Sequence, residues 1–186
     1  MSRFNIIETG IVGLAVIERE RLGDNRGFLS RLFCANELNA AGWVKSIAQI
    51  NHTYTQNKGT VRGLHFQHPP KCEMKLVSCI RGAVFDVAVD LRSESPTFLQ
   101  WYAEELSAEN NRALLIPEGF AHGFQSLTND AELIYFHSEF YSPKHEDGIL
   151  ISDPRLSIDW PEKIHEISAR DRTHKMLGEN FKGINV

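Results

Sequence analysis

The segment from Val61 to Gln67 contains the side chains best placed for chemistry in this sequence. Arg62 and His65 would face opposite sides of a regular strand, but Gly63 between them is a candidate β-bulge that would bring both to one face. The functional interpretation is a shared site. The structural interpretation is a half-exposed strand with an incidental histidine.

Three further side chains could assist proton transfer. Lys75 lies between apolar residues, so it is either a charge at a sheet edge or a cationic clamp that stabilises an oxyanion. Tyr135 and Tyr141 fit the core or rim of a sheet. A phenol can also act as a general acid when it faces a developing carbanion.

His122 and Asp171 have two interpretations each. His122 lies among aromatic residues and two glycines, which fits either a packed barrel corner or close approach of the backbone to a ligand. Asp171 completes a capping box that begins at Ser168, but a carboxylate can also orient a histidine and support its protonated form.

Metal-binding and phosphate-binding patterns are missing from the sequence. The eight histidines form no H-x-H pair, and His65 and His68 are three residues apart, which on a strand points them to opposite faces. No phosphate loop, dinucleotide-binding glycine motif or nucleophile elbow occurs. We therefore expect a site without metal.

The elements that would position these residues are short strands. About ten apolar runs rich in β-branched and aromatic residues, separated by turn signals, predict an all-β sandwich or small barrel. Short helices are expected at 36–41, ended by Gly42, and from Ser168 toward Leu177. The predicted strands are 13–20, 27–33, 46–53, 60–67, 75–81, 83–91, 98–106, 113–117, 120–127 and 132–141.

The clearest of these strands runs from Ala83 to Leu91. One of its faces is fully apolar, whereas the other carries Asp86 and Asp90. Two carboxylates on one face predict a surface that is either wet or paired with partners.

Composition bounds the class of protein. The 186 residues suit one domain, and the net charge of −4 gives no attraction to nucleic acid or anionic membrane. Three cysteines without paired spacing indicate free thiols in a reducing compartment. The first residues lack a signal sequence, and no run approaches the roughly 18 apolar residues of a membrane helix. We expect a soluble cytoplasmic protein.

Ordered motifs from about residue 5 to about residue 178 resemble the dTDP-4-dehydrorhamnose 3,5-epimerase family. The longest runs from Ile116 to Phe124. The others are Asp24–Phe28, Gln49 with Asn51 and His52, Arg62–His65, Lys75–Val77, Val84–Arg92, Ser95–Phe98, Leu106–Asn110, Tyr141–Pro143, Asp153–Pro154 and Ile158–Pro161.

The resemblance implies a fold and a reaction. The fold is a cupin jelly roll forming a single domain over residues 1–186, in a homodimer that exchanges an N-terminal strand. The implied reaction inverts C3 and C5 of a dTDP-4-keto-6-deoxyhexose without a cofactor, converting dTDP-4-dehydro-6-deoxy-D-glucose to dTDP-4-dehydro-L-rhamnose. Its product would serve L-rhamnose and cell-surface polysaccharide synthesis.

The resemblance also assigns roles to residues. His65 is the base, Asp171 its partner, Tyr135 the acid and Lys75 the lysine of the K-L-V motif. Tyr141 matches the residue that stacks on the nucleotide. The remaining contacts to nucleotide and sugar map to Arg26, Phe28, Gln49, Asn51, Arg62, His122, Glu146 and Arg170.

Four positions depart from the family pattern. Arg31 replaces a ligand-contacting glutamate, Leu99 a glycine, Phe136 a lysine and Ile151 a tryptophan. Two alternatives therefore stand beside the 3,5-epimerase: an enzyme that inverts one carbon or uses another nucleotide, and a sugar-nucleotide-binding cupin without turnover. The presence of both His65 and Tyr135 favours an enzyme.

Overall fold

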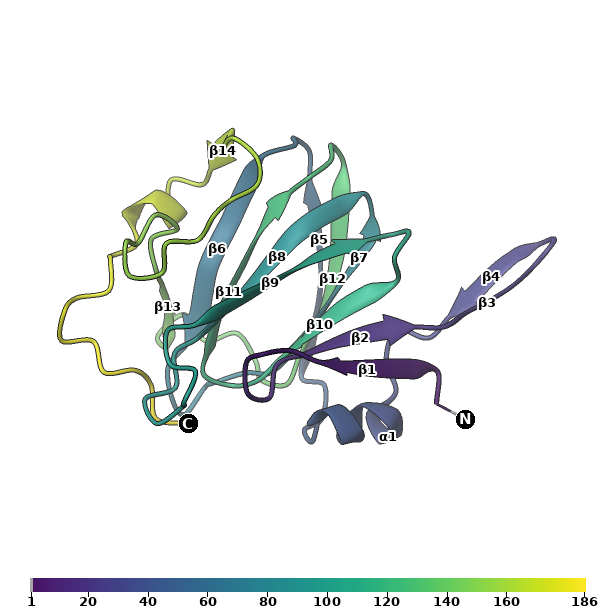
Figure 1. Cartoon of the computed structure of the whole chain (residues 1–186), viewed down its shortest axis with the longest axis horizontal. Coiled ribbons are helices and arrows are strands. Elements are labelled where there is room, and N and C mark those ends of the chain that lie inside the picture. Colours follow the sequence, from purple (N-terminus) through teal and green to yellow (C-terminus); the bar gives the residue numbers. More distant parts are fainter. Residues whose placement is uncertain (1) are drawn as a thin grey trace.

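A six-stranded antiparallel sheet faces a second six-stranded sheet across the molecule, as the alternating strand pattern predicts (Figure 1). Five strands of the second sheet form one antiparallel path, and the sixth runs parallel to its neighbour. The computed structural model describes residues 2–186. The first sheet has the order β1(Phe4–Glu8), β2(Ala15–Arg19), β10(Arg112–Ile116), β7(Lys75–Arg81), β12(Ala131–His137) and β5(Gln49–Thr55). The second has the order β13(Glu146–Gly148), β6(Thr60–Gln67), β11(Phe120–Ser126), β8(Ala83–Asp90) and β9(Trp101–Ser107).

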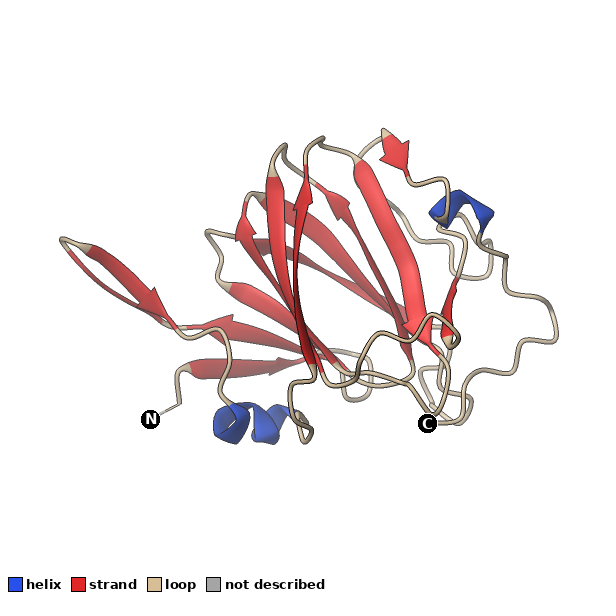
Figure 2. Ribbon diagram, turned by 180° about the vertical axis from the view of Figure 1, so that it is seen from behind, coloured by secondary structure: helices blue, strands red, loops and turns tan. Residues whose placement is uncertain are grey.

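Strands dominate the chain and helices are confined to two short segments (Figure 2). The predicted helix at 36–41 is α1(Ala35–Leu38) followed by the 3-10 turn η1(Asn39–Ala41), and Gly42 ends it with a left-handed φ of 96°. The helix expected from Ser168 is shorter than predicted, a single 3-10 turn, η2(Asp171–Thr173). The Ser168 hydroxyl accepts a hydrogen bond from the Asp171 amide, so the predicted cap contact is present.

The interior holds apolar side chains from both sheets. Val16, Val77 and Leu114 of the first sheet pack against Val84 and Phe124 of the second. A second cluster lies on the outer face of β8, where the C-terminal segment covers Val87 and Val89. Both faces of this strand are therefore buried, and Asp86 and Asp90 are paired with polar partners, as the two-carboxylate pattern indicated.

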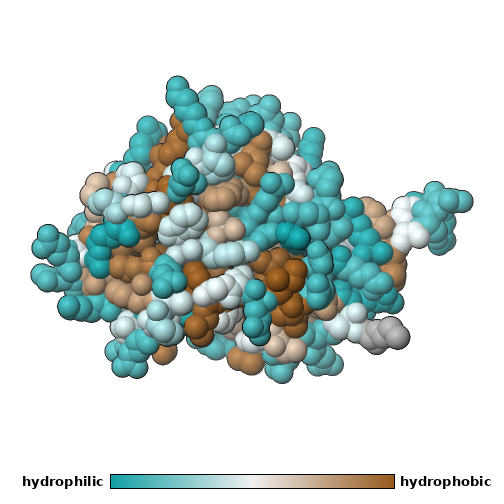
Figure 3. Space-filling view, in the orientation of Figure 1, coloured by the Kyte–Doolittle hydropathy of each residue, from teal (hydrophilic) through white to brown (hydrophobic). Residues whose placement is uncertain are grey.

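A hairpin projects from the body as an arm, formed by β3(Arg21–Asp24) and β4(Gly27–Ser30) (Figure 1). Leu22, Phe28 and Leu29 are exposed on it. Figure 3 shows that its tip is hydrophilic and that apolar residues lie toward its base. An isolated two-stranded hairpin is marginally stable in water, so this arm needs a surface to pack on.

Four strands were not predicted from the sequence because they are short or half polar. They are β1, β3, β13 and β14(Glu166–Ile167), the last of which runs parallel to β6. The three cysteines are free, and Cys72 and Cys79 are buried. None of the helices in residues 2–186 combines the length and apolar character needed to span a bilayer.

Candidate active site

A cavity of about 680 Å³ opens between the two sheets. Its walls come from the inner faces of β5, β7 and β12 on one sheet and of β6 and β11 on the other, and the C-terminal segment closes one side. A volume of this size suits a small molecule and is typical of ligand sites. Of the predicted catalytic and binding residues, the cavity is lined by Asn51, Arg62, His65, Lys75, His122, Tyr135, Arg170 and Asp171.

A β-bulge in β6 puts Arg62 and His65 on the same wall. His65 is opposite His122 and Arg62 is opposite Phe124. An advance of three residues along β6 thus spans the same length as an advance of two along β11, so β6 contains one extra residue. Gly63 takes a φ of 131°, and a Cβ there would lie 2.6 Å from the Gly123 Cα. The bulge that the sequence predicted is therefore present, and two facing glycines make room for it.

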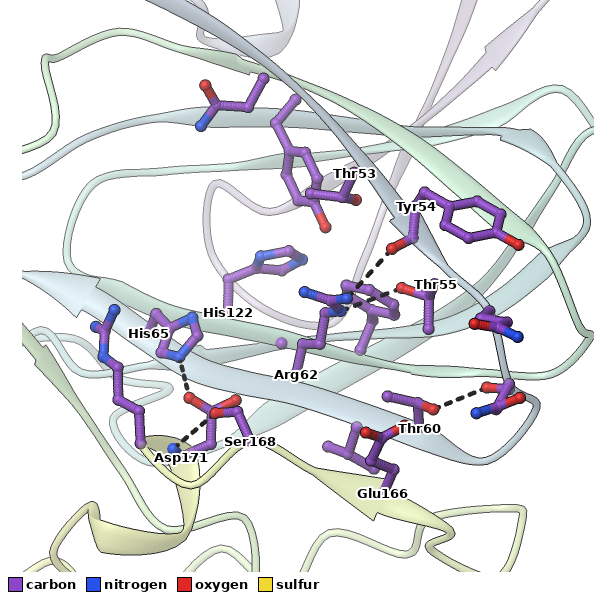
Figure 4. Close-up of a pocket in the computed structure, with 18 of the residues that line it drawn as sticks. Thr53, Tyr54, Thr55, Thr60, Arg62, His65, His122, Glu166, Ser168 and Asp171 are labelled. Atoms are coloured by element: carbon purple, nitrogen blue, oxygen red, sulfur yellow. Dashed lines mark hydrogen bonds and ion pairs between the residues drawn. The ribbon is translucent and has the colours of Figure 1, made fainter.

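His65 pairs with Asp171, more than a hundred residues away in the sequence. The Nε2 atom of His65 lies 2.8 Å from Asp171 Oδ1 (Figure 4). Because an ionised carboxylate only accepts hydrogen bonds, Nε2 donates and the other ring nitrogen, Nδ1, keeps a lone pair. The imidazole thus has the form that a general base requires.

The Asp171 carboxylate is itself held in place. Its Oδ2 accepts a bond from the Gly63 amide, and its own amide donates to Ser168. Burial acts to raise the pKa of Asp171, but the hydrogen bonds from His65 and the Gly63 amide outweigh it and keep the pKa below its ordinary value. Asp171 is therefore an anion that orients His65 and stabilises its protonated form.

His122 forms a second imidazole–carboxylate pair, with Asp86 of β8. Its Nε2 donates to Asp86 Oδ1 over 2.8 Å, and both side chains are almost fully buried. Burial lowers the pKa of His122, and Asp86 offsets this only in part. A neutral, fixed ring follows, which suits hydrogen bonding to a ligand better than proton abstraction.

Tyr135 lies on β12, on the sheet that faces His65. Its ring packs between His122, with centroids 5.9 Å apart, and His137, with centroids 6.0 Å apart. Burial raises the pKa of Tyr135 well above that of an ordinary phenol. The hydroxyl therefore carries its proton at neutral pH, which is the form that a general acid needs.

Lys75 is buried in the same wall and has a carboxylate partner. Its Nζ lies 3.2 Å from Glu73 Oε1, and Glu73 Oε2 accepts a bond of 2.8 Å from His137 Nδ1. Burial would raise the pKa of Glu73, but the charge of Lys75 and the bond from His137 lower it to about 2. Glu73 thus fixes two cavity-lining side chains.

Polar residues at the cavity rim could hold a charged ligand. Arg62 donates to the Thr55 hydroxyl and to the Tyr54 carbonyl (Figure 4). Arg170 forms an ion pair with Glu146, and the Tyr141 hydroxyl donates to the same carboxylate over 2.6 Å. The exposed Tyr141 ring is thereby held beside a cation.

Gln49, Arg26 and Phe28 do not line the cavity. Gln49 joins the rim network, because its amide donates to Asn51 and its carbonyl oxygen accepts from the Tyr141 amide. Arg26 and Phe28 lie on the β3–β4 arm, where Arg26 pairs with Asp24 and Phe28 is 61% exposed. The two arm residues do not line the cavity of their own chain.

The four departures from the family pattern also lie outside the cavity lining. Arg31 forms an ion pair with Glu37, and Phe136 stacks on Phe33 behind the sheet. Ile151 is buried, and its carbonyl oxygen accepts a hydrogen bond from the Trp160 indole. Leu99 has a positive φ of 62°, a conformation that glycine adopts more readily.

Several lining residues were missed from the sequence. Period-2 alternation from Tyr135 would have indicated His137, and alternation from Asn51 would have indicated Thr53 and Thr55. Glu73 precedes its strand, so no periodicity points to it. The cavity therefore holds a carboxylate-paired imidazole and a buried phenol on facing sheets, with a buried lysine beside them.

Comparison with known proteins gives a consistent result over nearly the whole chain. The family model described as dTDP-4-dehydrorhamnose 3,5-epimerase matches residues 8–179. The Shigella flexneri enzyme of that name is 45% identical over 168 residues, which cover 90% of this chain and 92% of the relative. A dTDP-4-dehydrorhamnose 3-epimerase from Streptomyces niveus is 40% identical over 171 residues, covering 91% and 82%.

A solved structure matches equally well. The dTDP-6-deoxy-D-glucose-3,5-epimerase of Legionella pneumophila, in complex with dTDP-4-keto-L-rhamnose, has a TM-score of 0.91 and 41% identity. The match covers 98% of each chain. The two proteins therefore share their fold over nearly the whole chain.

Proposed function

Because this chain belongs to the dTDP-4-dehydrorhamnose 3,5-epimerase family, we propose that it epimerises C3 and C5 of dTDP-4-dehydro-6-deoxy-D-glucose. It is an isomerase of the cupin fold. The product of the proposed reaction is dTDP-4-dehydro-L-rhamnose, for rhamnose-containing polysaccharide. We place the reaction in the cytoplasm, which the free cysteines support.

The chemistry starts at a carbon beside the C4 ketone. The Nδ1 atom of His65 removes the C–H proton, and the electron pair moves onto the ketone oxygen to give an enolate. Lys75 supplies positive charge for that oxygen inside the cavity, where such a donor is worth about 2.7–4 kcal/mol. Tyr135 then returns a proton to the opposite face of the same carbon.

Inversion depends on the two groups being different. If His65 returned its own proton, the original configuration would be restored. The observation that carries the proposal is that His65 and Tyr135 line one cavity from opposite sheets, the imidazole bonded to a carboxylate and the phenol buried. After each inversion His65 loses its proton to solvent and Tyr135 regains one.

The binding roles follow from position in the cavity. Neutral His122 and Asn51 would hydrogen-bond the sugar, and Arg62 and Arg170 would hold the diphosphate. Tyr141, at the exposed rim beside Glu146 and Gln49, would stack on the base.

We propose a homodimer in which the β3–β4 arm of one protomer completes the cavity of its partner. The arm exposes Phe28 and Leu29, and the outer face of the first sheet exposes Ile50 and Ile80. Arg26 and Phe28 would then contact the nucleotide in the partner's cavity.

The test is solvent-proton exchange with dTDP-4-dehydro-6-deoxy-D-glucose in deuterated water. Wild-type protein should incorporate deuterium at C3 and C5, detected by NMR and mass spectrometry. His65→Asn should lose exchange by at least about 100-fold, because a general base typically contributes that much or more. Tyr135→Phe should retain exchange but lose inversion.

Matched controls are His68→Asn and Tyr102→Phe, which alter the same residue types outside the cavity lining. Both should keep wild-type rates. Exchange at the wild-type rate in His65→Asn would show that another group is the base.

A second candidate is a 3-epimerase, favoured by the 40% identity to the Streptomyces niveus enzyme of that name. The same measurement separates the two reactions, because deuterium at C3 alone would select it.

A further inference from the structure

Two imidazoles converge on one carboxylate behind the base. His65 Nε2 lies 2.8 Å and His174 Nε2 3.5 Å from the same oxygen of Asp171. The three potential ligand atoms all lie within 4.8 Å of one another. The His65 and His174 rings meet edge to face, with centroids 5.5 Å apart.

The His174 ring is packed so that its Nε2 atom lies toward Asp171. Its Nε2 is buried and has no hydrogen-bond partner among the described residues, because the contact with Asp171 lacks hydrogen-bond geometry. Gly148, which is opposite His65 in the β13–β6 ladder, lies directly against the ring, where any Cβ would overlap it. The backbone therefore holds the His174 Nε2 atom toward Asp171, whether that atom carries a lone pair or a proton.

We propose that His65, Asp171 and His174 bind a divalent transition-metal ion of the zinc class, and that the bound ion blocks epimerisation. Two imidazole nitrogens and a carboxylate oxygen are preferred ligands of such ions. Ligand atoms around tetrahedral zinc lie about 3.3 Å apart, given bonds of about 2.0 Å, so small ring movements bring this group into range. Water or substrate oxygen would fill the fourth position.

The block follows from where the proton of His65 must lie. In the metal-free site the contact with the Asp171 carboxylate, which only accepts hydrogen bonds, puts the proton of the neutral ring on Nε2 and leaves the lone pair on Nδ1. A metal at Nε2 requires the lone pair there, so the single proton of the neutral ring moves to Nδ1. The ring then has nothing with which to take a proton from the sugar. This part rests on the proposed role of His65, whereas metal binding itself does not.

Binding is measured first, without substrate. Cobalt(II) added to the metal-free wild-type protein should give the visible absorption of one tetrahedral ion per chain, and zinc should displace it. His174→Phe keeps an aromatic ring against Gly148 but removes the ligand, so it should weaken cobalt binding by at least about 10-fold. His174→Gln serves the same purpose if the phenylalanine variant does not fold.

His52→Phe is the matched control, because His52 is also paired with a carboxylate, that of Glu132, outside the cavity lining. It should bind cobalt as wild type does. Equal affinity of wild type and His174→Phe, or no binding by either, would overturn the proposed site.

Inhibition is measured second, by proton exchange with and without zinc. Zinc should inhibit wild type, and a chelator should restore the rate. His174→Phe should be active without metal and need at least about 10-fold more zinc for the same inhibition. Binding without inhibition would refute the proposed block, and absent activity in metal-free wild type would refute the proposed function while leaving the binding result intact.

Discussion

Glu73 shows how a single carboxylate can organise one wall of the cavity. Its two oxygens reach Lys75 and His137, and its pKa is lowered to about 2 although burial acts in the opposite direction. A carboxylate with a lowered pKa stabilises the fold fully above its unfolded pKa, near 4.5, and this contribution is lost as the pH falls toward 2.

We therefore expect Glu73→Gln to be less stable than wild type by about 3 kcal/mol at pH 7, with the difference shrinking between pH 4.5 and 2. Urea unfolding at a series of pH values measures it. Glu94→Gln, at an exposed position, should have the same free energy of unfolding as wild type at every pH. A difference that stays constant with pH would show that the ion pairs do not cause it.

At the scale of elements, the bulge in β6 decides whether the site exists. Without the extra residue, Arg62 and His65 would point to opposite faces, and one of them would leave the cavity. The bulge depends on the close approach of Gly63 to Gly123, and the positive φ of Gly63 disfavours any side chain there.

Gly63→Ala should accordingly lower the free energy of unfolding by about 2 kcal/mol or more and reduce epimerase activity further than the stability loss explains. Gly10→Ala is the control, since a Cβ at position 10 meets nothing within 4 Å. Chemical denaturation and steady-state rates test both variants. Full activity in a folded Gly63→Ala protein would contradict the role given to the bulge.

At the scale of the whole molecule, the proposed role of the projecting arm decides how many chains make one site. The arm exposes its apolar residues and holds Arg26 and Phe28 away from the cavity of its own chain. If the arm acts in the partner's cavity, two defective chains can complement each other.

The prediction is made for a mixture of His65→Asn protein with the double variant Arg26→Ala/Phe28→Ala, each inactive alone. After subunits exchange at equal amounts, half of the dimers are mixed, and one of their two cavities has both an intact base and an intact arm. About a quarter of wild-type activity should return. No recovery, although mass spectrometry detects mixed dimers, would place the arm in its own chain's site.

The sequence alone determined the all-β class, most of the strands and the bulge at Gly63. These features depend on neighbouring residues, whose alternation and turn chemistry fix the local backbone. The motifs also indicated His65, Tyr135 and Lys75, because these residues lie within the strands that carry them.

Only the tertiary structure decided which distant side chains meet. Asp171 and His174 reach His65 across about a hundred residues, and Glu73 joins Lys75 to His137 from outside any strand. No local period encodes such contacts, since sheet packing and the path of the C-terminal segment create them. The physical reason is that pKa shifts and ligand geometry depend on separation in space, which folding sets.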